Sequence, residues 1–209
     1  MKRKAFVFSF LVFALFPIVS HAQYAGGEMM PFFEPLRFGW VHEGGLGAAY
    51  LTGEGRDQYT SGGGLYYSGI FRPQPNLGFG LHVAGGYMDL GSINAVEQTM
   101  NYQVFGGEAR VYVPAGMLDF WANVVLGVGR IDKVVGDSDG FTEVAETLGG
   151  ALVGFGVGGD FYLTPNLSVG LHLRMYRLYP KEEEATGDLS NAKFVGMWMT
   201  VGAVGTLHY

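Results

Sequence analysis

Ionisable side chains set within apolar segments are the part of this 209-residue sequence with the most capacity for chemistry. Glu108 and Arg110 precede a turn at Pro114-Ala115, and Asp119 follows it. Pairing across that turn would set Arg110 opposite Asp119, on one face of two strands. We expect these two residues to form an ion pair, because a buried charge without a partner is costly. A wider polar network is expected to include Glu108, Asp160, Arg174, His82 and His172.

His82 and His172 are the candidates for metal ligation. Two histidines without a third ligand do not make a typical site, so we expect both to be structural. Asp137, Asp139 and Glu143 resemble part of a calcium-binding loop, but the Gly and the terminal Glu of the full EF-hand spacing are missing. We therefore expect no metal ion and no cofactor.

Ser68 and Ser168 are candidates for a nucleophile, which needs a neighbouring base for activation. Ser168 lies four residues before His172, and after residue 22 no Ser stands beside a His. We therefore expect no catalytic residues.

The composition excludes several classes of protein. The sequence has no Cys, so a disulfide framework, a thiol nucleophile and a Cys-ligated metal site are excluded. There are 13 Lys and Arg against 19 Asp and Glu, which is the wrong balance for binding nucleic acid. The 35 Gly lack a collagen period and occur beside many aromatic residues, so we expect a folded chain.

Residues 1–22 are typical of a cleaved secretory signal. Lys2, Arg3 and Lys4 precede the apolar residues 5–19, and Ser20 and Ala22 occupy the −3 and −1 positions of a cleavage site. A membrane anchor is the alternative, but the apolar stretch is shorter than the ~20 residues that a spanning helix needs.

Period-two alternation dominates the remaining chain. From Leu167 to Met175 every second residue is large and apolar, and the residues between are small, polar or amphipathic. Side chains alternate between the two faces of a strand, so this segment has one apolar face. The same division recurs at residues 77–84, 118–129, 151–161 and 195–209. Weaker signals mark strands at 65–71 and 105–113 and at 38–50, where Gly44-Gly45 suggests a bulge.

Short and long connections alternate along the chain. Three short turns contain Pro, at residues 72–76, 114–116 and 164–166. Longer polar stretches lie at 52–61, 89–99, 132–147 and 180–192, and they contain acidic residues. Such a series predicts an all-β fold of eight antiparallel strands, with both ends of the chain on the side of the short turns.

Bulky apolar residues on one face and Gly or isolated polar residues on the other are typical of a transmembrane β-barrel, whose apolar face meets lipid. We therefore predict an eight-stranded antiparallel up-and-down transmembrane barrel. A soluble periplasmic barrel would need the apolar face turned inward to hold an apolar ligand. Candidates for interfacial aromatic belts are Trp40, Tyr50, Tyr67, Tyr87, Trp198 and Tyr209.

These features resemble the OmpA-like and OmpX-like eight-stranded outer-membrane barrel family. The resemblance rests on the signal segment, the Tyr-Leu-Thr-Pro-Asn-Leu turn at residues 162–167, the Gly-rich alternating strands and an alternating final strand that ends on Tyr209. It implies a barrel over residues 36–209, a short periplasmic segment at 23–35 and a location in the outer membrane of a Gram-negative bacterium, with both termini periplasmic. It also implies contact with outer-membrane lipid and lipopolysaccharide, recognition by the barrel-assembly machinery during insertion, and a monomer.

The expected role is structural, adhesive or surface-interacting, and it is carried by four long acidic external loops around a largely plugged lumen. A channel for ions or small solutes is the first alternative, since the polar network could act as a gate. A lipid-modifying outer-membrane enzyme is the second alternative.

Overall fold

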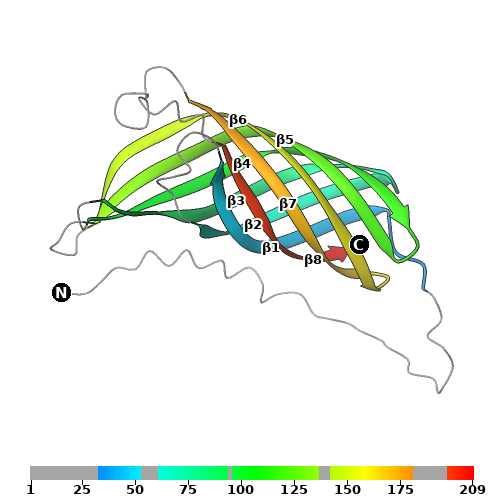
Figure 1. Ribbon diagram of the computed structural model, residues 1–209. Coiled ribbons are helices and arrows are strands. Elements are labelled where there is room, and N and C mark those ends of the chain that lie inside the picture. The colour runs from blue at the N-terminus through cyan, green and yellow to red at the C-terminus, as the bar shows by residue number, and fades with distance from the viewer. Residues whose placement is uncertain (1–32, 53–60, 94–95, 137–141, 181–196) are drawn as a thin grey trace. The chain divides into compact units, whose positions relative to one another are not determined.

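The computed structural model describes residues 33–52, 61–93, 96–136, 142–180 and 197–209, which form a closed barrel of eight antiparallel strands (Figure 1). The predicted fold class is confirmed. The residues of the predicted signal segment and most of the predicted loops at 52–61 and 180–192 lie outside the described residues. No helix among the described residues is long and apolar enough to cross a membrane.

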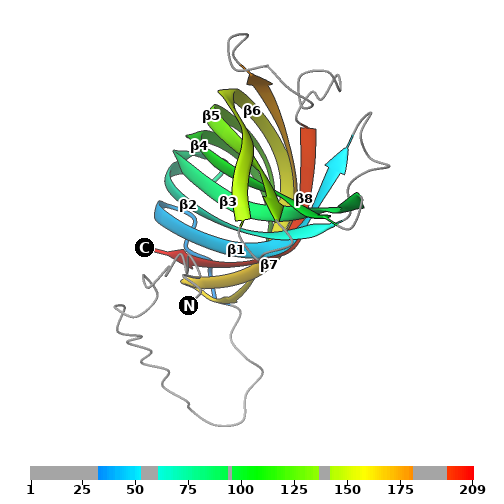
Figure 2. The same cartoon turned by 90° about the vertical axis from the view of Figure 1, so that its left-hand side faces the viewer.

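The strands follow one another around the wall in chain order, and each pairs with its two neighbours (Figure 2). β1 closes the barrel against β8, from Val41 opposite His208 to Thr52 opposite Met197. Closure leaves no free edge in the paired part of the wall. The strands are β1 Gly39–Thr52, β2 Gly62–Gln74, β3 Leu77–Ile93, β4 Val96–Ala115, β5 Leu118–Gly136, β6 Thr142–Thr164, β7 Leu167–Pro180 and β8 Met197–His208.

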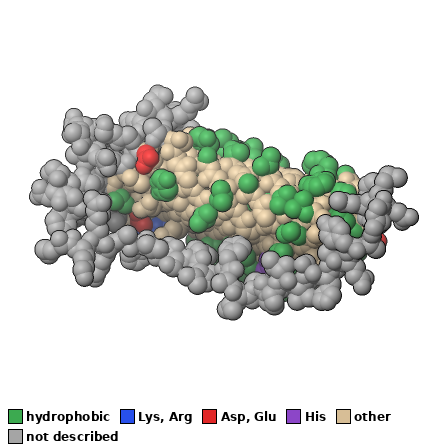
Figure 3. Space-filling view, turned by 90° about the horizontal axis from the view of Figure 1, so that it is seen from below, with side chains coloured by type: hydrophobic (Ala, Val, Ile, Leu, Met, Phe, Trp, Pro, Cys, Tyr) green, Lys and Arg blue, Asp and Glu red, His purple; other side chains and the backbone are tan. Residues whose placement is uncertain are grey.

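The large apolar side chains face outward, as the alternation predicts. Leu171 is 70% exposed and Phe79 is 49% exposed, whereas Arg174 and His82 in the opposite phase are buried. Figure 3 shows hydrophobic side chains distributed along the visible wall. In water this distribution would be unfavourable, because a wide apolar surface would be exposed to solvent.

The turn between β4 and β5 differs from the prediction. It is formed by Gly116 and Met117, and Gly116 has a φ of 64°, a conformation that glycine adopts without steric cost. Pro114 consequently lies opposite Asp119, and Arg110 lies opposite Asn123. The register predicted from a turn at Pro114-Ala115 is therefore wrong.

The bulge predicted at Gly44-Gly45 is absent. β1 pairs with β2 without interruption from Gly39 to Ala49. Gly45 has another explanation, since a Cβ atom there would lie 2.2 Å from the ring of Tyr66. The glycine makes room inside the barrel for this aromatic side chain.

Two of the predicted long loops are partly strand. β3 continues to Ile93 and β4 begins at Val96, while β5 continues to Gly136 and β6 begins at Thr142. Their residues are too polar to show the alternation of a lipid-facing strand, but backbone pairing across each hairpin continues. In Figure 1, β5 and β6 reach further than β1 at the end away from the short turns.

Trp198 does not belong to an interfacial belt. It is fully buried inside the barrel, because β8 places Met197 and Met199 on the outer phase and Trp198 on the inner phase. The other predicted belt residues, Trp40, Tyr50, Tyr67, Tyr87 and Tyr209, are 40–54% exposed on the outside.

Candidate functional site: the barrel lumen

A central ion cluster fills the middle of the lumen. It consists of Glu43, His82, Glu108, Arg110 and Arg174, contributed by four different strands, and all five side chains are buried. Arg110 donates to both carboxylates, at 2.5 and 3.0 Å to Glu43 and at 2.6 and 3.0 Å to Glu108. Arg174 donates to Glu43 at 2.8 Å. Two guanidinium groups thus balance two carboxylates, which offsets the desolvation of each charge.

The hydrogen bonds of His82 define its role in this cluster. Arg174 lies 2.9 Å from Nδ1 of His82, and a guanidinium is always a donor, so Nδ1 is the acceptor. Nε2 therefore carries the proton and donates to the hydroxyl of Tyr176 at 2.8 Å. Ser68 donates to Glu108 at 2.8 Å. His82 is consequently a neutral link between the ions and the hydroxyl groups.

Aromatic rings separate the charges from the wall. The guanidinium carbon of Arg110 lies 4.1 Å from the centre of the Trp121 ring, and that of Arg174 lies 5.3 Å from the same ring. The guanidinium carbon of Arg174 also lies 4.2 Å from the centre of the Tyr66 ring. Cation–π contacts of this kind stabilise desolvated arginines.

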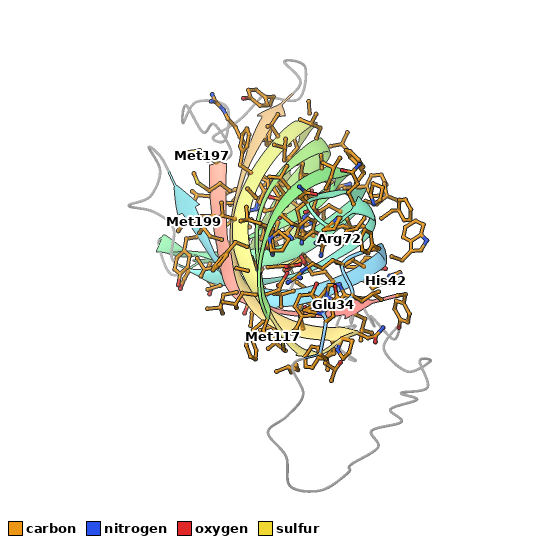
Figure 4. The ribbon with its side chains drawn as sticks, turned by 90° about the vertical axis from the view of Figure 1, so that its right-hand side faces the viewer. Glu34, His42, Arg72, Met117, Met197 and Met199 are labelled. Atoms are coloured by element: carbon orange, nitrogen blue, oxygen red, sulfur yellow. The ribbon has the colours of Figure 1, made fainter. Side chains whose placement is uncertain are left out.

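A second group of charges closes the end of the barrel where the short turns lie. Asp119 accepts from Arg72 at 2.9 Å, from Arg37 at 2.8 Å and from the hydroxyl of Tyr162 at 3.0 Å. Arg37 precedes β1 and also donates to the carbonyl of Gly116 at 2.5 Å. Figure 4 shows Arg72 pointing into the barrel, while Met197 and Met199 lie along β8.

The segment before β1 crosses this end of the lumen. The backbone N–H of Leu36 donates to the carbonyl of Pro165 at 2.9 Å, in the turn between β6 and β7. Arg37 reaches the turn between β4 and β5. These bonds tie the segment to two turns, and it forms a strap over the opening.

The residues that the sequence predicted for the network all lie inside the barrel, but they do not form one group. Glu108, Arg110, Arg174 and His82 meet in the central ion cluster. The predicted pair of Arg110 with Asp119 does not form, because the shifted register gives Asp119 to Arg37 and Arg72 instead.

Asp160 and His172 are buried members of the predicted network that make no ion pair among the described residues. Oδ1 of Asp160 and Nδ1 of His172 have no hydrogen-bond partner in the described part of the chain. Nε1 of Trp121 is also buried without a hydrogen-bond partner among the described residues. Such atoms are candidates for bonds to internal water.

Several members of the network are not among the predicted residues. Glu43 is the most important, because it binds both arginines of the central ion cluster. Continuous alternation from the outward Trp40 places Glu43 inside, so the alternation of β1 is the signal that could have found it. The others are Ser68, Arg72, Asn123 and Tyr176.

Two serines do lie beside histidines, contrary to the expectation from the sequence. Oγ of Ser68 is 2.9 Å from Nδ1 of His82, and Oγ of Ser168 is 3.1 Å from Nε2 of His208. Both contacts join residues from different strands, so adjacent positions in the chain could not reveal them. Both serines are fully buried.

An apolar cluster fills the lumen at the end where the strands are longest. Six of its members come from six different strands and are almost completely buried: Met88, Met100, Ile131, Leu148, Leu178 and Trp198. A cavity of about 10 Å³ lies between this cluster and the ions, lined in part by Tyr66, Tyr102 and His172. This is room for roughly one water molecule.

The sequence matches no family model and no curated protein. Solved structures do match. The crystal structure of Neisserial surface protein A (NspA) aligns with a TM-score of 0.55 and 15% identity, over 81% of this chain and 96% of that one. The outer membrane protein OprG from Pseudomonas aeruginosa aligns with a TM-score of 0.52 and 11% identity, over 84% and 99%.

The chain has the fold of the eight-stranded outer-membrane barrels. The predicted OmpA-like and OmpX-like architecture is confirmed at the level of the fold. At this identity the likeness extends to the barrel and does not assign a ligand or an activity.

Proposed function

We propose that this chain is a monomeric, non-enzymatic protein of a Gram-negative outer membrane that presents a rigid surface for adhesion or other contacts outside the cell. The observation that carries the proposal is the set of buried ionic and apolar side chains inside the barrel, combined with strands that are longer than a bilayer requires. Such an interior favours a scaffold over a channel, and long strands supply the surface.

The wall supports insertion in the membrane. Outward residues such as Leu126 and Leu171 are 61% and 70% exposed, and burying them in hydrocarbon is favourable. The short turns and both described ends of the chain lie at one end of the barrel. Outer-membrane barrels have short turns on the periplasmic side, so this end is periplasmic in the proposal.

The external surface would be formed by β3 to β6. These strands have 17, 20, 19 and 23 residues, whereas the other four have 12 to 14. About 9–11 tilted residues cross a bilayer. The excess forms a paired sheet, in which residues 142–149 of β6 pair only with β5 among the residues that the structure describes. A sheet is a more rigid platform for a partner than a loop.

An adhesion assay on whole cells tests the platform. In a shortened variant, residues 133–146 are replaced by Asn-Gly, which joins Asp132 and Thr147 by a two-residue hairpin turn at their existing register. Cells with the full chain should adhere to matrix proteins or glycans, and cells with the shortened variant should adhere much less. Extraction by detergent only, with a heat-dependent gel mobility, serves as the control that both proteins are inserted barrels. Equal adhesion by both would overturn the role of this sheet.

A narrow channel is the second candidate. The central ion cluster and the atoms of Asp160 and His172 without a described partner could bind water molecules in that half of the lumen. Recordings in planar bilayers separate the two functions. The proposal expects no stable conductance from the full chain, and a stable large conductance would favour the channel.

A further inference from the structure

Two arginines stand on the outer face of the wall, and both lie near the end away from the short turns. Arg130 is on β5 and Arg177 is on β7, whereas the other strand arginines, Arg72, Arg110 and Arg174, are buried in the lumen. The side chain of Arg130 is 55% exposed, and Arg177 is also exposed. A cation on a lipid-facing wall needs a favourable partner, because burying it in hydrocarbon is costly.

Each arginine marks the point where the apolar wall ends. On β5 the outward residues before Arg130 are Leu126 and Val128, at 61% and 58% exposure. On β7 the outward residues before Arg177 are Leu173 and Met175. The next outward residue on β7 is Tyr179, an aromatic residue of the type that prefers the membrane interface. Both guanidinium groups therefore lie at the level of the lipid headgroups.

The two side chains flank the same strand. Arg130 lies opposite Gly149 of β6, and Arg177 lies opposite Val153. β5 and β7 are two strands apart, roughly 10 Å across the wall, and the partners of the two arginines on β6 lie four residues apart, roughly 13 Å along the strand. The two Cα atoms are therefore about 16 Å apart, a span that two extended arginine side chains and a disaccharide headgroup can bridge. Between them β6 has Gly149 and Ala151 on its outer face. These small residues leave a shallow depression in the surface between the two arginines.

Both guanidinium groups are held in place by neighbours. Nε of Arg130 donates to Asp132 at 2.8 and 3.0 Å, and Asp132 also accepts from Thr147 at 2.6 Å. Arg177 lies over the ring of Tyr179, at 5.0 Å from its centre. Arginines that are ordered before binding lose less entropy when they bind a planar or tetrahedral oxyanion.

We propose that Arg130 and Arg177 bind the phosphorylated headgroup of one glycolipid of the outer leaflet, which lies across β6. Guanidinium groups form strong paired bonds with phosphate oxygens, and the acyl chains of the same lipid would pack on the apolar residues below. The inference rests on the proposed insertion in the outer membrane, and it adds a specific lipid to that proposal.

Binding to lipid nanodiscs tests the site. The purified full chain is titrated with phosphatidylcholine discs that contain a bisphosphorylated acylated glucosamine disaccharide, and retained glycolipid is counted by native mass spectrometry. Arg130→Gln and Arg177→Gln should each weaken retention by on the order of tenfold, because each removes charge-assisted bonds. Arg130→Lys and Arg177→Lys should retain more than the Gln variants.

Arg37→Gln is the matched control, since it removes one positive charge at the opposite end of the barrel and should leave retention unchanged. The proposal is overturned if the double Gln variant retains the glycolipid as well as the full chain does. It is also overturned if the dephosphorylated glycolipid, free inorganic phosphate or phosphatidylglycerol binds equally well.

Folding of each variant is checked by the heat-dependent shift in gel mobility. Asp132→Asn provides a second test, because it frees Arg130 from its carboxylate partner and removes a negative charge that would repel phosphate. It should leave retention at or above that of the full chain, in contrast to Arg130→Gln. Fractionation of cells separates this inference from the proposed function. An inserted barrel that fails to bind glycolipid contradicts the site alone, and a soluble protein contradicts the proposed function.

Discussion

The two halves of the lumen hold different kinds of buried side chain. Toward the short turns, ions from many strands meet in the central ion cluster and around Asp119. Toward the long hairpins, Met, Leu, Ile and Trp side chains form the apolar cluster. The first half depends on the exact partner of each charge, and the second depends on volume. The comparison shows that the interior of one barrel can be stabilised by ion pairs in one half and by apolar packing in the other. Substitutions in the two halves should therefore lower stability for different reasons.

Removal of Arg110 should have the largest effect. Arg110→Met leaves Glu43 and Glu108 sharing Arg174 alone, and breaking a buried ion pair costs about 3–5 kcal/mol. The free energy of unfolding is measured with urea in lipid vesicles. The double variant Arg110→Met/Glu43→Gln keeps Glu108 with Arg174, so it should recover a large part of the loss. Equal losses in the single and double variants would mean that volume, and not charge, decides this half as well.

Truncation of Trp198 should have the next largest effect. Trp198→Ala removes the largest side chain of the apolar cluster, and such changes cost about 3 kcal/mol or more in a packed core. No second substitution that changes charge should rescue it. Trp198→Phe restores much of the volume and should restore much of the stability. A Phe variant as unstable as the Ala variant would contradict the packing explanation.

The strap contributes less, because Arg37 is partly exposed and Asp119 keeps a second arginine. Arg37→Gln should lower the free energy of unfolding by about 1 kcal/mol, the usual contribution of one such hydrogen bond. Hydrogen exchange at the backbone amide of Leu36 provides the local measurement. Faster exchange there, with unchanged exchange in β3, is the expected result.

Substitution of Asp160 should have the smallest effect on the free energy of unfolding. The sign of that effect should distinguish Asp160 from Glu43. Its Oδ1 atom has no hydrogen-bond partner among the described residues. Asp160→Asn should therefore change stability by less than about 1 kcal/mol or increase it, because an unpaired buried charge is unfavourable. Glu43→Gln, measured in the same way, should destabilise. A strong loss for Asp160→Asn would reveal a partner such as an internal water or cation.

Much of the barrel could be predicted from the sequence because lipid-facing strands follow a simple rule. Residues such as Leu171 and Phe79 alternate with small or polar ones, and eight such segments separated by turns close only as a barrel. The rule stops where strands leave the membrane. There the sequence is polar, so the extensions of β3 to β6 resemble loops in the sequence.

The partners inside the lumen could not be predicted in the same way. The pairing of Arg110 depends on the register, and the register depends on whether the turn is formed by Pro114-Ala115 or by Gly116-Met117. The apolar cluster was concealed for another reason. Near the long hairpins both faces of a strand are apolar, as with Leu152 inside and Ala151 outside, so alternation in polarity disappears.

The seam between β1 and β8 joins the parts of the wall that are furthest apart in the chain, and it ends with two backbone bonds between Trp40 and Tyr209, at 3.0 and 2.8 Å. Until those strands meet, each would carry a row of unsatisfied amide and carbonyl groups that hydrocarbon cannot solvate. A sheet in which β1 and β8 are not yet paired is thus unstable within a bilayer. We therefore expect membrane insertion to be cooperative. Pairing of β1 with β8 would be the step that completes it.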